Sequence, residues 1–103
     1  MSKTTPADLA VAFRSLERRR REAIDAADGA AVSGPLRELD LHIAAAATLL
    51  GAAPSAAAVA DAVAARPTEE WEESVLDQLR QHAIDAGTAL RRVIDAAPRS
   101  DDD

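Results

Sequence analysis

The sequence contains no cysteine and no tyrosine, and its only large aromatic side chains belong to one phenylalanine and one tryptophan. Without cysteine, the protein can form neither a disulfide framework nor a Cys-ligated metal site, and it has no thiolate chemistry. The residues after Met1 lack the apolar stretch typical of a signal peptide. The longest weakly polar stretch, residues 43–53, is too short to span a bilayer. We therefore expect a cytoplasmic protein with no membrane association.

Large aliphatic side chains are also scarce. Leu, Ile, Val and Phe together account for 21 of the 103 residues, whereas 26 residues are alanine. Alanine costs less free energy to place in a helix than any other residue, so this composition favours helices. The number of large apolar residues lies near the lower end for a globular domain. The sequence therefore predicts a helical protein that gains further buried surface by forming a homodimer.

The charge balance argues against nucleic acid as a partner. The net charge is −6, so the chain is repelled by phosphates unless its basic residues form a patch. The run of four arginines at 18–21 does not form one, because consecutive residues of a helix point in different directions. Residues 59–79 resemble a helix-turn-helix in spacing, but the second helix would present four glutamates, at 69, 70, 72 and 73, to the DNA. We expect no nucleic-acid binding.

Capping residues and prolines divide the chain into four predicted helices. Thr5 followed by Pro6 and Asp8 is typical of a helix start, whereas Gly29 and Gly51 are typical of helix ends. Pro67 ends the third helix, because the residue before a proline avoids the helical conformation. The predicted helices span about residues 6–28, 35–50, 55–66 and 69–97, and residues 98–103 form a disordered acidic tail.

Apolar residues recur at helical spacing in each of these segments, and no segment alternates with the period of a strand. The connections are short, which favours antiparallel neighbours. The predicted fold is therefore an all-α, antiparallel up-down bundle of three long helices and one short alanine-rich helix. It comprises a single domain, residues 1–103.

Arg20 is a candidate interaction residue because it lies in the middle of the apolar face of the first helix. A guanidinium in this position must either extend its charged end to water or meet a carboxylate, since an unpaired buried charge is destabilising. We expect Glu72, on the inward face of the fourth helix, to be its partner if the first and fourth helices are antiparallel. The alternative is that Arg20 belongs to an interface with another subunit.

The two large aromatic residues, Phe13 and Trp71, are further candidates for an interface. Tryptophan is enriched among the residues that dominate binding energy at interfaces. The alternative for Trp71 is that it covers the end of the bundle. His42 and His82 each lie at the edge of an apolar face, but neither has a carboxylate three positions before it, as a di-metal bundle would require.

No phosphate-binding loop or catalytic constellation is recognisable, so we expect no enzyme activity, no metal and no cofactor. The sequence favours a non-enzymatic protein–protein interaction module that self-associates. Two alternatives remain open. One is a small regulator that binds a larger protein through the first or fourth helix, and the other is a metal- or ligand-binding bundle that uses the two histidines.

Overall fold

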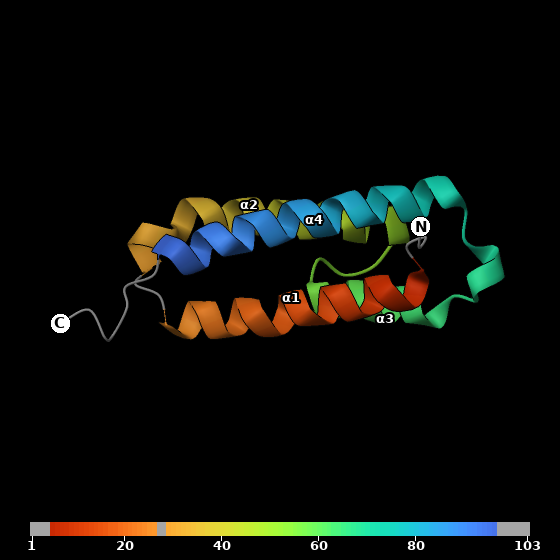
Figure 1. The fold of residues 1–103 in the computed structure, drawn as a ribbon, viewed down its shortest axis with the longest axis horizontal. Coiled ribbons are helices and arrows are strands. Elements are labelled where there is room, and N and C mark those ends of the chain that lie inside the picture. Colours follow the sequence, from red (N-terminus) through yellow and green to blue (C-terminus); the bar gives the residue numbers. More distant parts are fainter. Residues whose placement is uncertain (1–4, 27–28, 97–103) are drawn as a thin grey trace.

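The computed structural model describes residues 5–26 and 29–96, which form a bundle of helices (Figure 1). The elements in chain order are α1 (Pro6–Ala26), α2 (Gly29–Leu50), α3 (Ala56–Ala65), the 3-10 turn η1 (Thr68–Glu70) and α4 (Glu73–Ala96). No strand occurs within the described ranges, so the predicted all-α bundle is confirmed. The predicted acidic tail, residues 98–103, lies outside the described residues.

Side-chain hydrogen bonds cap the N-termini of α1 and α3 at the starts predicted from the sequence. At α1, the Thr5 hydroxyl accepts a hydrogen bond from the backbone N–H of Asp8 (3.1 Å), and the Asp8 carboxylate accepts one from the N–H of Thr5 (3.3 Å). At α3, the Ser55 hydroxyl accepts a hydrogen bond from the N–H of Ala58. Both arrangements satisfy amides that have no partner inside the helix.

The predicted start of the second helix at residue 35 is wrong. α2 begins at Gly29, and Pro35 lies inside it. A proline within a helix lacks one N–H donor and crowds the preceding turn. Pro35 destabilises only that turn of the helix. Residues 30–32, Ala-Ala-Val, can extend the helix toward its N-terminus.

The predicted fourth helix is also wrong at its start, because the segment 69–97 is not continuous. Residues 68–70 form η1, and Trp71 adopts an extended backbone (φ −86°, ψ 127°) before α4 starts at Glu73. The extended residue allows the indole to turn toward the core, where only 9% of Trp71 is exposed. Burial of this large side chain outweighs the helix propensity of the glutamates around it.

The helices pack in two layers, with α2 against α4 and α1 against α3 (Figure 1). α1 also contacts α4 and α2 contacts α3, so α1 and α2 lie on a diagonal of the bundle. α1 and α4 run in the same direction and α2 runs opposite to both, so the expectation that α1 and α4 are antiparallel is wrong.

The connection between α2 and α3 explains this difference. Gly51, with φ +65°, ends α2, and the N–H of Ala52 donates back to the carbonyl of Ala47. Residues 51–55 then return along the bundle, so that α3 runs in the same direction as α2 (Figure 1). The chain therefore leaves α3 at the end of the bundle where α1 starts, and α4 starts from that end as well.

The core is built from one face of each helix. Its largest fully buried side chain belongs to Phe13, which is 0% exposed and therefore packs inside the bundle. The other fully buried large side chains are those of Leu39, Val59, Val63, Leu79, Leu90 and Val93. Alanines such as Ala46, Ala60 and Ala86 fill the space between these residues, which allows the helices to approach closely.

Replacement of Phe13 tests how much of the stability depends on this small core. We expect Phe13→Ala to lower the free energy of unfolding by about 3–5 kcal/mol, because a cavity replaces the largest core side chain. Val11, on the same helix, is 66% exposed, so Val11→Ala should change stability by no more than about 0.5 kcal/mol. Urea denaturation followed by circular dichroism measures both. Equal effects of the two substitutions would contradict the assignment of Phe13 to the core.

Candidate interaction surface

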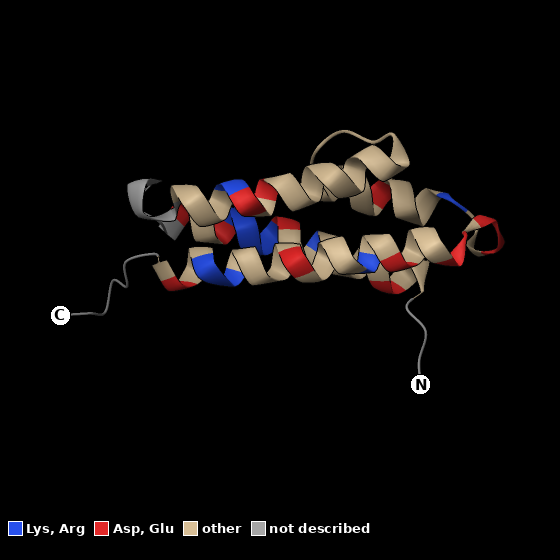
Figure 2. Ribbon diagram, turned by 90° about the horizontal axis from the view of Figure 1, so that it is seen from above, with Lys and Arg blue, Asp and Glu red and all other residues tan. Residues whose placement is uncertain are grey.

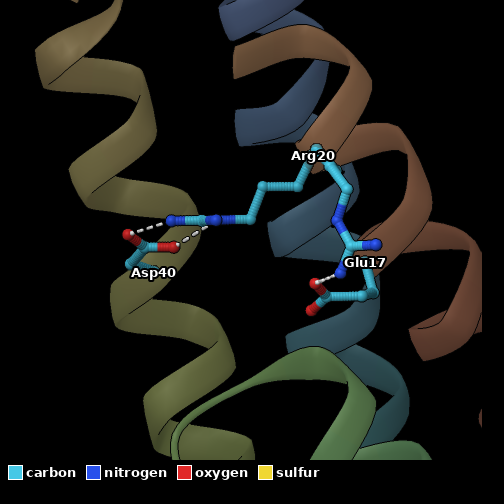
Figure 3. A network of polar contacts seen from close by, with 4 residues as sticks. Glu17, Arg20 and Asp40 are labelled. Atoms are coloured by element: carbon cyan, nitrogen blue, oxygen red, sulfur yellow. Dashed lines mark hydrogen bonds and ion pairs between the residues drawn. The ribbon is translucent and has the colours of Figure 1, made fainter. Parts of the chain in front are cut away.

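Arg20 forms a two-pronged ion pair with Asp40. The Arg20 Nε atom donates to Asp40 Oδ1 at 2.9 Å, and Nη2 donates to Oδ2 at 3.1 Å. Figure 3 shows the Arg20 side chain reaching across from α1 to Asp40 on α2, with Glu17 one turn earlier on α1. The planar guanidinium fits a carboxylate in this geometry, which makes such pairs stronger than single-contact ion pairs.

The expected pairing of Arg20 with Glu72 is therefore wrong. Glu72 is exposed, precedes the first residue of α4, and lies at the end of the bundle where α1 begins. Arg20 lies toward the opposite end of α1. Because α1 and α4 are parallel, the start of α4 cannot come level with Arg20. The carboxylate that meets Arg20 comes from the antiparallel helix α2.

The position of this ion pair follows from the short α3. α3 has 10 residues and α1 has 21, so α3 covers only part of the groove between α1 and α2. Arg20 and Asp40 lie directly before the start of α3, since they line one cavity of about 340 Å³ together with Ser55 and Ala56. The ion pair thus joins the diagonal helices where no fourth helix separates them.

The electrostatic environment keeps Arg20 charged. The hydrogen bonds that Arg20 donates to Asp40 are the main cause that raises the pKa of Arg20 above the ordinary arginine value, and partial burial opposes this increase. The negative charges of Asp40 and Glu17 raise it further. A pKa raised in the folded state stabilises the fold below the unfolded-state pKa. This contribution is therefore present at every pH below the strongly alkaline range in which arginine titrates.

Trp71 covers the end of the bundle. The indole packs on the core, and the Arg66 guanidinium carbon lies 4.2 Å from the ring centroid. This distance is typical of a cation–π contact. The indole Nε1 atom is buried without a hydrogen-bond partner in the structure. Trp71 thus closes the core, and so little of it is exposed that a partner could reach it only if this end of the bundle opened.

The two histidines meet between α2 and α4, with the ring centroids of His42 and His82 6.3 Å apart. Beside His42 lies a cavity of about 130 Å³ lined also by Glu38, Asp85 and Arg92. The carboxylates there already have partners, because Glu38 pairs with Arg92 at 2.7 Å and Asp85 accepts a hydrogen bond from Gln81. Within the described part of the chain, no group of three or more His, Asp or Glu side chains could hold a metal ion.

The outer face of α2 is a surface that we did not single out from the sequence. Its residues, which face away from the core, are Leu41, Ala45, Thr48 and Leu49, and we refer to them as the α2 outer face. Leu41 is 62% exposed and Leu49 is 39% exposed. The Thr48 hydroxyl donates to the carbonyl of Ala44 at 2.9 Å, so its polar group is satisfied within the helix.

A signal for this face was present in the sequence. Residues 41–60 contain no Asp, Glu, Lys or Arg. Where the stretch forms the end of α2, one side of the helix packs in the core. The opposite side of the helix is exposed and carries no charged group. Figure 2 shows the contrast, since α2 carries no acidic or basic residue from Leu41 to its end, whereas α4 carries both signs along its length.

Comparisons of the chain with protein-family models, with curated proteins and with solved structures give no match. Among the residues that the structure describes, no helix is long and apolar enough to cross a membrane.

A double-mutant cycle on Arg20 and Asp40 tests the ion pair. The side chains are 30% and 47% exposed, so the pair lies between surface pairs, worth about 0–1 kcal/mol, and buried pairs, which cost about 3–5 kcal/mol to break. We expect a coupling energy of about 1–2 kcal/mol between Arg20→Leu and Asp40→Leu in urea denaturation. Glu72→Gln should change stability by less than about 0.5 kcal/mol. A coupling energy near zero would show that the pair does not stabilise the bundle.

Proposed function

We propose that the protein is a non-enzymatic, cytoplasmic interaction module that acts as a homodimer. The observation that carries this proposal is the α2 outer face, a strip of exposed side chains without charge on a protein of net charge −6. Contiguous apolar surface on a soluble protein is typical of interaction sites.

A second copy of the chain fits the face better than a charged partner does. Residues 41–53 offer no charged side chain with which an acidic or basic partner could form an ion pair. The face instead presents leucine, alanine and threonine side chains, which can pack against an identical set. Burying Leu41 and Leu49 gains free energy in proportion to the apolar area removed from water, at about 25 cal/mol per Å².

The composition supports the same proposal. Only 21 of the 103 residues are Leu, Ile, Val or Phe, and yet Leu41 and Leu49 lie outside the core of the single chain. In a chain with so few large apolar residues, leaving two leucines exposed on one helix forgoes part of the stabilisation that burying them would give. A dimer through α2 would recover it.

The state of the protein in solution tests the proposal directly. We expect light scattering and sedimentation at micromolar concentration to give about twice the 10.8 kDa mass of one chain. Leu41→Glu should yield monomers, because it places a carboxylate in the apolar contact. Val11→Glu is the matched control, since Val11 is 66% exposed and Leu41 62%, and it should remain dimeric. A monomeric wild-type protein, or equal loss of dimer in both variants, would contradict the proposal.

The salt dependence separates this contact from binding through charged helices. Two copies of charge −6 repel each other, and salt screens this repulsion. The dimer dissociation constant should therefore stay constant or fall as NaCl is raised from low to high concentration. An interface built from the arginines of α1 and the glutamates around η1 would weaken instead. Sedimentation equilibrium at two salt concentrations measures the difference.

A further inference from the structure

The spacing of residues on α2 indicates how two copies would meet. Leu41, Ala45 and Leu49 recur at intervals of four residues on the side of α2 that faces away from the core. The two leucines of the α2 outer face lie four residues before and four residues after Ala45. The strip is thus nearly symmetric about Ala45.

This symmetry matches an antiparallel pair of helices. If a two-fold axis passes beside Ala45, Leu41 of one copy lies opposite Leu49 of the other, and each Ala45 faces its equivalent. The large side chains then flank a small central residue, so they interdigitate around a point where the helix axes can approach closely. A closed two-fold contact of this kind satisfies both copies at once.

The charges on α2 discriminate between the two possible directions. In a parallel pair, Arg37 would face its own equivalent and so would Glu38, which places like charges together. In the antiparallel pair Arg37 and Glu38 extend past the partner's α2, which ends at Leu50, so they meet no like charge on that helix. The antiparallel arrangement also opposes the two helix dipoles favourably. Residues 41–50, the part of α2 that forms this contact, contain no Asp, Glu, Lys or Arg, so the contact is free of like-charge repulsion.

We propose that the partner at the α2 outer face is the α2 helix of a second copy, antiparallel to the first and related to it by a two-fold axis beside Ala45. This inference rests on the proposed self-association and adds its direction and register. It assigns the close contact to Ala45 and the main apolar contact to Leu41 of one copy with Leu49 of the other.

Single cysteines test the register, because the chain has no cysteine of its own. Ala45→Cys should form a disulfide-linked dimer under mild oxidation, since a residue beside a two-fold axis lies close to its equivalent. The control is Ala57→Cys, on the exposed side of α3. Ala45→Cys should cross-link about ten-fold or more faster than the control, because association holds its thiols together. Equal rates would overturn the inference.

Two further variants test the direction. Leu41→Cys and Leu49→Cys should each give little cross-linked product alone, whereas an equimolar mixture should give the 41–49 disulfide, identified by mass spectrometry of the linked peptides. Disulfides that join 41 to 41 and 49 to 49 would indicate parallel helices and overturn the inference, although self-association would stand. A wild-type protein that sediments as a monomer at all concentrations would instead remove the proposed function itself.

Discussion

The length of α3 constrains the arrangement of the whole bundle. A helix of 10 residues spans about 15 Å, whereas α1, α2 and α4 have 21, 22 and 24 residues. The chain steps back over residues 51–55 before α3 begins, and α4 must therefore run parallel to α1. Beyond the start of α3 the bundle has three helices, and the guanidinium of Arg20 joins two of them through Asp40. A polar contact thus holds together a region that a longer α3 would have filled with apolar side chains.

α2 is the helix with two distinct environments. One side supplies Leu39, Ile43 and Ala46 to the core, and the opposite side carries the α2 outer face. The first half of the helix is tied to its neighbours by charge, through Asp40 to α1 and through Glu38 to α4. From Leu41 to its end, α2 carries no acidic or basic side chain and packs on the core through Ile43, Ala46 and Ala47. This division along one helix separates the part that fixes the fold from the part that we propose for association.

Local signals in the sequence predicted the fold well, and long-range contacts limited the rest. The reciprocal contacts of Thr5 and Asp8 and the cap at Ser55 involve residues within three positions, so their consequences are visible in the sequence. Pro35 and Trp71 misled the prediction. The helix-forming residues before Pro35 extend α2 past it, and burial of the Trp71 side chain outweighs the helix propensity of its neighbours. Predicting the partner of Arg20 would have required knowing the direction of α4. That direction depends on how residues 51–55 turn. Nothing in the spacing of Arg20 on its own helix distinguishes Asp40 from Glu72. Predicting the α2 outer face would have required knowing which side of α2 packs in the core.

The position of Trp71 also determines which part of the molecule fluorescence can monitor. The chain has no tyrosine and no second tryptophan, so its near-ultraviolet emission arises almost entirely from one indole at one end of the bundle. That ring is packed on the core and stacked against Arg66. Its fluorescence therefore follows the detachment of the η1 segment and of the first turn of α4, whereas far-ultraviolet dichroism averages over every helix. The Arg20–Asp40 region, toward the other end of the bundle, is spectroscopically silent.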